Sequence, residues 1–279
     1  MMRIGILGAG SMAEAMISGL ISGNVVRPDQ ISVINRSDRS KLLYIQDQYG
    51  VNVSENKEEL LACSDVIILA MKPKDAQEAI LSIRPYVKKQ LFLSVLAGIT
   101  IQTIQKLLGK KAPVIRAMPN TSAAIQMSAT AISPSEEVTM HQLKIAKHLF
   151  ETIGMVAVVE EHRLDAVTAL SGSGPAYVYY FIEAMEHAAS EVGLDKDIAK
   201  SLILQTLAGA SEMLMQSDKQ AAQLRREVTS PGGTTEAGIE KLKDCRFHEA
   251  IVACVKKAAE RSVELQALVS KEEKKIRKA

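Results

Sequence analysis

The chain has 279 residues, of which 47% are hydrophobic and 24% are charged, and its formal net charge at pH 7 is +2. This length allows two domains with cores of their own, and the composition is typical of a soluble globular protein. The small net charge argues against a basic face for nucleic acid. No run of 18 apolar residues occurs, and the N-terminal apolar stretch is too short for a signal peptide. We therefore expect neither a membrane span nor a secreted protein.

The cysteines and histidines follow no pattern of a bonded or metal-binding site. Cys63, Cys245 and Cys254 form neither a CxxC pair nor an even set for disulfides, which favours a cytoplasmic protein. The five histidines lack metal-ligand spacing with Cys, Asp or Glu, so we predict no metal site.

The N-terminal half alternates short apolar runs with amphipathic segments. We predict strands at 3–7, 31–34, 66–70, 91–95, 113–118 and 155–159, with helices at 11–22, 37–49, 74–84, 100–108 and 136–150. The apolar runs are continuous, as in parallel strands buried on both faces. Alternating strands and helices predict βαβ units, and hence an α/β fold with a Rossmann-type, doubly wound, mostly parallel sheet.

After about residue 162 the strand pattern ends. Helices are predicted near 176–192, 196–216 and 246–269. We place the domain boundary so that residues 1–161 form the sheet domain and 162–279 an all-α domain. Because a helix of more than twenty residues is hard to bury within so small an all-α half, we expect a partner subunit to cover it in a homo-oligomer.

A glycine motif follows the first strand directly. "GAGSMA" places Gly8, Gly10 and Ala13 in a G-x-G-x-x-A pattern, before a predicted helix whose free N–H groups would face an anion. A plain glycine turn is the alternative. The position after a clear strand and before a clear helix favours a site for the pyrophosphate of a dinucleotide. The predicted cofactor-binding residues here are Leu7, Gly8, Ala9, Gly10, Ser11 and Met12.

The end of the second strand indicates which dinucleotide binds. An NAD site usually has an acidic residue there, whereas this chain reads Asn35, Arg36 and Ser37. A cation with two small polar groups favours a 2′-phosphate, so we predict NADP(H) in preference to NAD(H), which remains possible. Asp38 lies close by and weakens that preference.

The loops after two later strands belong to the same predicted rim, since ligands bind at the carboxyl ends of strands in open α/β sheets. The first is "AMKP", with Ala70, Met71, Lys72 and Pro73 assigned to the cofactor. Lys72 as a simple strand-end residue is an equally good interpretation. The second is "LAGIT" at 96–100.

Two unusual runs stand in the helical half. "VTSPGGTTEAG" at 228–238 is either a turn or a cradle, because a glycine pair before a helix exposes N–H groups that bind carboxylates. "LSGSGPAYVYYF" at 170–181 is either a bare helix N-terminus, with Pro175 in the first turn, or a surface packed close to a ligand.

The motifs "GAGSMAEA", "AMKP", "SVLAGIT", "RAMPNT", "LSGSGPAY" and "TSPGGTT" occur in the order seen in pyrroline-5-carboxylate reductases. The resemblance covers about residues 2–268 and implies reduction of a cyclic imine by NAD(P)H to give L-proline, the last step of proline biosynthesis. It also implies a helical C-terminal domain that interlocks with a second subunit, giving a dimer and possibly a decamer as a pentamer of dimers. One departure is Ser122, where the family commonly has Pro, and we expect a small effect on a turn.

The resemblance also implies roles for individual residues. Thr235 is predicted to be catalytic, with its hydroxyl beside the substrate nitrogen. The other predicted substrate-binding residues are Ser171, Gly172, Ser173, Gly174, Asp218, Ser230, Gly232, Gly233 and Thr234, of which Ser230, Gly232, Gly233 and Thr234 are assigned to the carboxylate. Asn56, Ala97 and Asn120 complete the predicted cofactor site.

Two rival functions remain at this point. A β-hydroxyacid dehydrogenase would need a lysine on the helix after its central glycine motif, and residues 171–186 contain no basic residue, which disfavours it. A non-catalytic, NADP-binding regulator on the same fold is the other. Loss of the "SPGGTT" run would have favoured the regulator, and that run is intact.

Overall fold

The computed structural model describes residues 2–276, which form two compact units. The N-terminal unit comprises residues up to Ser173 together with the last helix from Ala258 onward, and the C-terminal unit is Gly174–Lys257. Each unit is described by itself.

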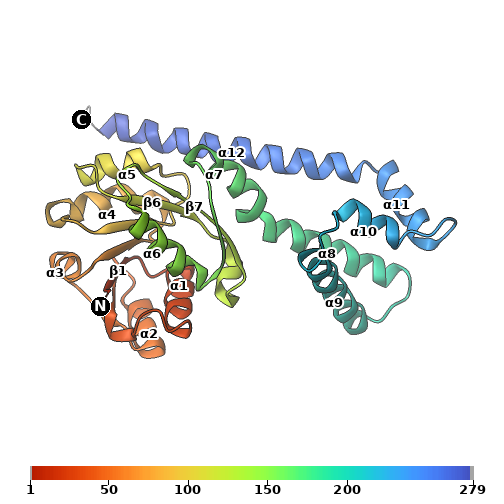
Figure 1. Cartoon of the computed structure of the whole chain (residues 1–279), viewed down its shortest axis with the longest axis horizontal. Helices are drawn as coiled ribbons and strands as arrows, with labels where there is room; N and C mark the ends of the chain where they lie inside the picture. Colours follow the sequence, from red (N-terminus) through yellow and green to blue (C-terminus); the bar gives the residue numbers. More distant parts are fainter. Residues whose placement is uncertain (1, 277–279) are drawn as a thin grey trace. The chain divides into compact units, whose positions relative to one another are not determined.

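An eight-stranded sheet forms the centre of the N-terminal unit (Figure 1). Its strand order is β3-β2-β1-β4-β5-β6-β7-β8, and every neighbouring pair is parallel except β6 and β7. The strands are β1 Ile4–Leu7, β2 Ile31–Ile34, β3 Asn52–Val53, β4 Val66–Leu69, β5 Leu91–Ser94, β6 Val114–Met118, β7 Ser128–Pro134 and β8 Gly154–Val158. The predicted fold class is confirmed, because the order reverses at β1 and β4 as in a doubly wound sheet.

Helices cover both faces of this sheet (Figure 1). They are α1 Ser11–Ser22, α2 Arg39–Tyr49, α3 Lys57–Ala62, α4 Ala76–Ile83, α5 Ile101–Leu108, α6 Met140–Glu151 and the short α7 Leu164–Val167. Buried residues of α1, α2 and α6 share one apolar cluster with the strands, and those of α3, α4 and α5 share another. Two cores on opposite faces explain why β1 and β4 are apolar at every position.

The strands β3 and β7 and the short helices α3, α7 and α10 are not among the segments predicted from the sequence. β7, "SATAISP", is largely buried between β6 and β8, yet small Ala, Ser and Thr side chains give it no apolar run. β3 has only two residues, and α3 has six. Their positions are set by pairing and packing with neighbours rather than by a pattern of their own.

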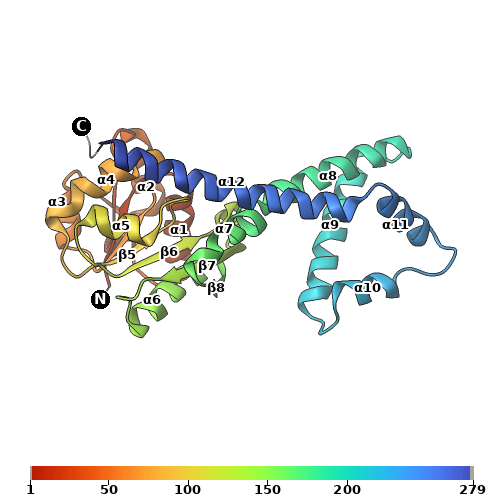
Figure 2. The same ribbon diagram turned by 90° about the horizontal axis from the view of Figure 1, so that it is seen from above.

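The C-terminal unit is helical, and beyond β8 no strand occurs in the described residues. It contains α8 Gly174–Glu191, α9 Lys196–Met215, α10 Ala221–Glu227, α11 Thr234–Asp244 and the first part of α12 Phe247–Ile276. α8 and α9 pack against each other around Ala189, Ala199 and Ile203 (Figure 2). α12 begins one residue from its predicted start but continues past the predicted end at 269 to Ile276.

The units divide at different places from the predicted boundary between 161 and 162. Residues 162–173 lie in the N-terminal unit because α7 contacts β7 and because Asp165 accepts hydrogen bonds from α12. The bonds come from Ser262 Oγ at 2.6 Å and Gln266 Nε2 at 2.7 Å. These two residues, 97 and 101 positions away in sequence, return the chain to the N-terminal unit.

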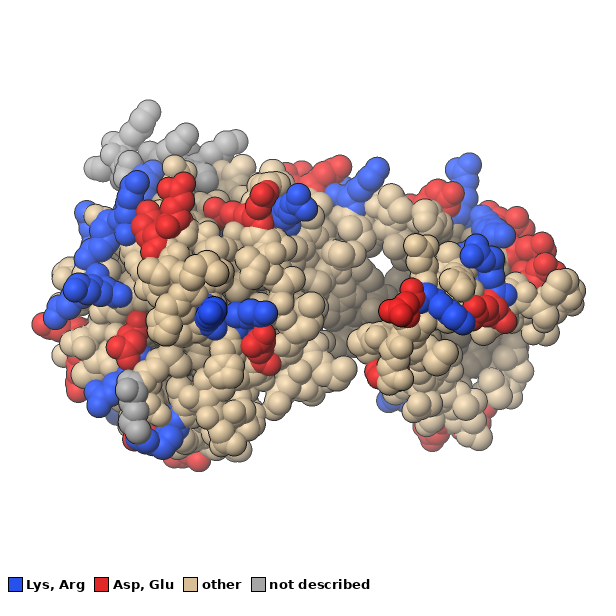
Figure 3. Space-filling view, in the orientation of Figure 1, with Lys and Arg blue, Asp and Glu red and all other residues tan. Residues whose placement is uncertain are grey.

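Charged side chains of both signs are interspersed over the face shown in Figure 3. Among the described residues, no helix is long and apolar enough to cross a membrane. In the same part of the chain, no three His, Cys, Asp or Glu side chains gather in a way that could hold a metal ion.

Candidate functional site

A cleft of about 810 Å³ opens at the carboxyl ends of β1, β2 and β4 in the N-terminal unit. Ten predicted cofactor-binding residues line it: Leu7, Gly8, Ala9, Gly10, Asn35, Arg36, Ser37, Ala70, Met71 and Lys72. The carboxyl ends of parallel strands at a reversal of strand order are where α/β sheets bind ligands. The cleft therefore lies where the glycine motif predicted a dinucleotide.

Glycine occurs at the two positions of the motif for different physical reasons. Gly8 has a φ of +113°, and a Cβ there would lie 2.5 Å from the backbone oxygen of Ala70. It must be glycine so that β1 can turn against the end of β4. A Cβ on Gly10 would meet nothing within 4 Å, because this position faces open space.

Helix α1 begins directly after Gly10, which is its N-cap residue. Its first-turn N–H groups lack partners inside the helix, and the positive end of its dipole lies there. Ala13 is fully buried against the sheet, as the third position of the motif requires. Open space at Gly10 beside a helix N-terminus fits a pyrophosphate.

At the end of β2, Asp38 has a structural task. Its side chain caps α2 by accepting a hydrogen bond from Lys41 N at 2.9 Å, and Ser40 Oγ donates to the same oxygen at 2.8 Å. The backbone hydrogen bond from Lys41, followed by the Ser40 hydroxyl, lowers the pKa of Asp38. Asp38 therefore caps α2, and its carboxylate also lines the cleft.

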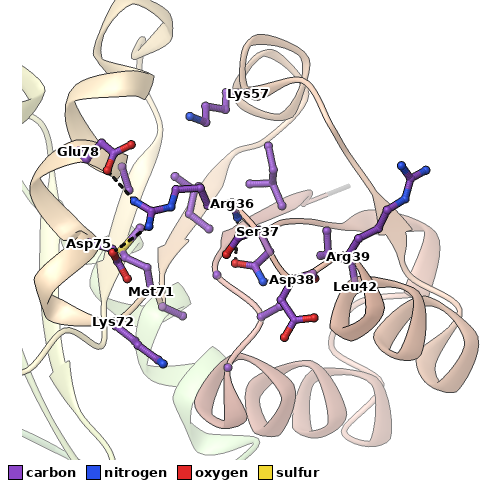
Figure 4. A pocket seen from close by; sticks show the side chains of 18 of the residues that line it. Arg36, Ser37, Asp38, Arg39, Leu42, Lys57, Met71, Lys72, Asp75 and Glu78 are labelled. Atoms are coloured by element: carbon purple, nitrogen blue, oxygen red, sulfur yellow. Dashed lines mark hydrogen bonds and ion pairs between the residues drawn. The ribbon is translucent and has the colours of Figure 1, made fainter.

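Arg36 carries the cation that the sequence singled out, and its guanidinium lies between two carboxylates of the segment after β4 (Figure 4). Nη1 is 2.6 Å from Glu78 Oε2, and Nη2 is 3.5 Å from Asp75 Oδ1. Asn35 Oδ1 accepts from Arg36 N at 2.9 Å and so orders the turn. Arg36 and Glu78 are 42 residues apart in sequence, so only the fold brings them together.

Eleven further residues line the cleft that were not assigned to the cofactor from the sequence: Ile34, Asp38, Arg39, Leu42, Ser54, Glu55, Lys57, Lys74, Asp75, Glu78 and Ala79. Most come from α2, from the loop before α3 and from the start of α4, whose polar faces turn toward the cleft. The polar start of the helix after "AMKP" was the available signal, but amphipathic helices have such faces generally.

Six predicted cofactor-binding residues lie outside this lining: Ser11, Met12, Asn56, Pro73, Ala97 and Asn120. Ser11 and Met12 begin α1, and Pro73 begins a single 3₁₀ turn. Asn56 neighbours the lining residues Glu55 and Lys57, and its Oδ1 caps α3 by accepting from Glu58 N at 2.9 Å. Their roles toward the cofactor stay predictions.

Asn120 connects "RAMPNT" to "LSGSGP" within the N-terminal unit. Its Nδ2 donates to the carbonyl of Ser171 at 3.1 Å, and its Oδ1 accepts from Ser122 N at 3.1 Å. A proline at 122, common in the family, has no N–H to donate. Ser122 therefore adds a hydrogen bond that orients Asn120, beyond the small effect on a turn that the sequence suggested.

The "LAGIT" loop after β5 is held from two sides. Glu161 Oε1 accepts from Ile101 N at 2.8 Å and from the buried Arg116 at 2.9 Å, which fixes the start of α5. Ala97 is exposed, and Gly98 has a φ of +74°. A Cβ on Gly98 would lie 3.9 Å from Gln266 of α12. Gly98 therefore lies near α12.

α8 begins at Gly174 with Pro175 in its first turn, as the first interpretation of "LSGSGPAYVYYF" expected, but a further helical turn precedes it. Thr168–Gly172 is a π-helical turn, closed by a 2.8 Å hydrogen bond from Ser173 N to the carbonyl of Thr168. π-helical turns are rare in proteins, and those that occur are often found at functional sites. Gly172 lies close to Met118, since a Cβ there would be 2.8 Å from Met118 Cε. Gly174 begins α8 in the C-terminal unit.

The "TSPGGTT" run forms the entry to α11 in the C-terminal unit, with Gly233 as N-cap. Gly232 has a φ of +73°, and its N–H donates to Glu236 Oε2 at 2.7 Å. The Gly233 N–H donates to the carbonyl of Ser230 at 3.0 Å. Two of the three N–H groups assigned to a substrate carboxylate thus have partners in the chain, and one partner is itself a carboxylate.

Thr234 and Thr235 are the first residues of α11, and Thr235 is exposed. Asp218 is an exposed residue of the bend between α9 and α10. These residues belong to the C-terminal unit, whereas the nucleotide cleft belongs to the N-terminal unit.

Two family models match the chain. One is described as NADP oxidoreductase coenzyme F420-dependent and matches residues 3–98, and the other as pyrroline-5-carboxylate reductase dimerisation and matches residues 161–265. The chain is 56% identical over 266 residues to pyrroline-5-carboxylate reductase 2 of Bacillus subtilis (strain 168), covering 95% of this chain and 96% of that protein. The chain belongs to the pyrroline-5-carboxylate reductase family.

Solved pyrroline-5-carboxylate reductase structures have the same fold. The enzyme from Coxiella burnetii is 34% identical with a TM-score of 0.89, covering 95% of this chain and 98% of that one. The Plasmodium falciparum pyrroline carboxylate reductase, determined with NADP bound, is 29% identical with a TM-score of 0.86 and the same coverage. The resemblance noted from the motifs is therefore confirmed.

Proposed function

We propose that this chain reduces the C=N bond of 1-pyrroline-5-carboxylate to give L-proline, with NADPH preferred over NADH as hydride donor. The observation that carries the proposal is an intact "TSPGGTT" entry to α11 in a chain that also has the glycine-lined cleft, at 56% identity to a reductase of this name. We also propose a cytoplasmic homo-dimer, and its assembly into a decamer as a pentamer of dimers.

The cleft fits a dinucleotide because its glycines leave space where a phosphate would approach. Gly10 and the N-terminus of α1 would hold the pyrophosphate, and Arg36 with Ser37 would hold the 2′-phosphate. When bound, the dinucleotide supplies the hydride. Ala70 to Lys72 form the opposite wall of the cleft and would orient it.

The substrate places modest demands on the protein. Once its nitrogen is protonated, the C=N carbon accepts hydride far better than a neutral carbonyl, so no strong general acid is needed. Binding the carboxylate and fixing the ring would supply most of the acceleration. The absence of a basic residue from 171–186 agrees with an imine rather than a hydroxyacid substrate.

The entry to α11 would meet these demands. Thr234 N–H at the helix N-terminus, with Ser230 and the Gly232–Gly233 backbone, would bind the carboxylate. The Thr235 hydroxyl would accept or donate a hydrogen bond at the ring nitrogen. Asp218 and Ser171 to Gly174 are proposed as further substrate neighbours.

The test follows NADPH absorbance in purified full-length protein supplied with 1-pyrroline-5-carboxylate, with L-proline quantified as product. The expected result is stoichiometric conversion of both reactants. Coenzyme binding without consumption of the imine would favour a regulator instead. Oxidation of a 3-hydroxyacid by NADP⁺, measured in parallel, would favour the dehydrogenase.

A further inference from the structure

The Arg36 ion pairs form a cluster in which one cation faces two anions inside the nucleotide cleft (Figure 4). Glu78 is 2.6 Å from Nη1, and Asp75 is 3.5 Å from Nη2. All three residues line the cleft, and Asp75 and Glu78 come from the segment that follows β4. The cluster has a formal charge of −1 where the proposed function places a phosphate dianion.

The remaining cations of the cleft differ in how they are engaged. Arg39 Nη2 is 3.4 Å from Glu55 Oε1, and Lys57 Nζ donates to Ser82 Oγ at 2.9 Å. Within residues 2–276, neither Lys72 nor Lys74 has a side-chain partner. Arg36 is therefore the cleft cation that is held by two carboxylates, and a 2′-phosphate must compete with both for it.

The exposure of the three side chains determines how strongly the two carboxylates compete with a phosphate for Arg36. Arg36 is 61% exposed, Glu78 71% and Asp75 29%. Ion pairs this exposed are weak, because water solvates the separated charges well. A phosphate that binds the guanidinium in a bidentate manner can displace them, so the carboxylates reduce the affinity without abolishing it.

We propose that Glu78, assisted by Asp75, sets the coenzyme preference by competing with the 2′-phosphate for Arg36. This inference rests on the proposed function, since it assumes a dinucleotide in the cleft. The same carboxylates also accept hydrogen bonds of the kind that ribose hydroxyls donate in NAD sites. Glu78 thus lowers the preference for NADPH and allows NADH to bind.

The experiment measures binding of adenosine 2′,5′-bisphosphate and of 5′-AMP, which differ only by the 2′-phosphate, by isothermal titration calorimetry at constant ionic strength. The proteins are wild type, Glu78→Gln, Arg36→Ala and the double variant. Glu55→Gln is the matched control, because Glu55 is a carboxylate of the same cleft that pairs with Arg39 instead. Circular dichroism of each variant verifies the fold.

Glu78→Gln is expected to tighten the bisphosphate about three- to fivefold, the size of an exposed ion pair, without tightening 5′-AMP. The gain should disappear in the Arg36→Ala background, and Glu55→Gln should give a smaller gain. An equal gain for both nucleotides, a gain that persists without Arg36, or no gain would overturn the inference. Protein that binds the bisphosphate as expected yet does not reduce the imine would overturn the proposed function alone.

Discussion

The two units of the chain differ in how far their large apolar side chains are buried. The N-terminal unit buries two large clusters on the two faces of its sheet, including Phe92 and Phe150 with no exposed surface. The cluster within the C-terminal unit has only Ala189, Ala199 and Ile203 as buried members. Many large apolar side chains there are exposed: Val178, Tyr179, Tyr180, Phe181, Met185, Ile198, Leu202, Leu204, Met213, Leu214, Ile251 and Val252.

The N-terminal unit thus buries a large apolar core by itself, whereas the C-terminal unit leaves many large apolar side chains exposed. Exposed apolar surface of this extent marks an interface with another protein. It lies within the region matched by the dimerisation model, residues 161–265. The exposed apolar side chains lie on α8 and α9 as well as on α12, the helix whose length suggested a partner subunit.

A charge placed on the exposed apolar surface of the C-terminal unit is expected to have the largest effect, because it should weaken the proposed dimer. Tyr180→Asp and Leu202→Asp, at side chains 75% and 55% exposed, should each raise the dimer dissociation constant on the order of 100-fold or more. Light scattering across a dilution series measures it. Leu43→Asp, 48% exposed in the N-terminal unit, is the control and should leave the dimer intact. A dimer that survives both substitutions would contradict the interpretation.

Substitution of two glycines tests the geometry of the nucleotide cleft in the N-terminal unit. Gly8→Ala should lower the free energy of unfolding by about 2–4 kcal/mol, because it combines a positive φ with a backbone clash. Gly10→Ala should leave stability unchanged, since its Cβ meets nothing, yet weaken coenzyme binding about tenfold or more. Urea denaturation and coenzyme fluorescence titration separate the two effects. Equal destabilisation by both variants would show that the cleft geometry is wrong.

The C-terminal unit is tested at its proposed catalytic hydroxyl. Thr235→Ala should lower kcat about ten- to 100-fold with coenzyme affinity unchanged, because the ring nitrogen loses its hydrogen-bond partner. Thr229→Ala is the control, since that hydroxyl already donates to the carbonyl of Arg225 at 2.6 Å. Unchanged turnover in the Thr235 variant would refute the assigned role.

The smallest effect is expected at Glu236, whose carboxylate accepts the Gly232 N–H. Glu236→Gln should lower KM for the imine about two- to threefold with kcat unchanged, because it removes a negative charge beside the proposed carboxylate site. Glu240→Gln, one turn further along α11, should have no effect. A raised KM would mean that the Glu236 carboxylate helps to form the cradle rather than competing with the substrate.

Comparison of sequence and structure shows which features were predictable. All six predicted strands occur. β1, β4 and β5 are buried at every position and therefore have continuous apolar runs, whereas β8 has such a run although Met155 and Val158 are exposed. The glycine motif was predictable because its spacing, directly after a strand and before a helix, is contained in one short run of residues. Ten of the predicted cofactor residues line the cleft because they lie at or just beyond the carboxyl ends of β1, β2 and β4.

Other features depend on partners far away in the chain. β7 consists of small residues and exists because β6 and β8 pair with it on both sides. The π-helical turn at 168–172, with the sequence TALSG, has no residue pattern that predicts it. The return of α12 to the N-terminal unit depends on hydrogen bonds from Ser262 and Gln266 to Asp165, about a hundred positions away.

Six strands, the longer helices, the nucleotide loop and the family could be predicted from the sequence alone, because each is carried by a short run of residues. Only the tertiary structure decided that Asp38 caps a helix, that Arg36 is held by Glu78 and Asp75, and that the Gly232 N–H already binds a carboxylate. The charge and shape of a side chain follow from its residue type, whereas its hydrogen-bond or ion-pair partner depends on which residues the fold brings close to it.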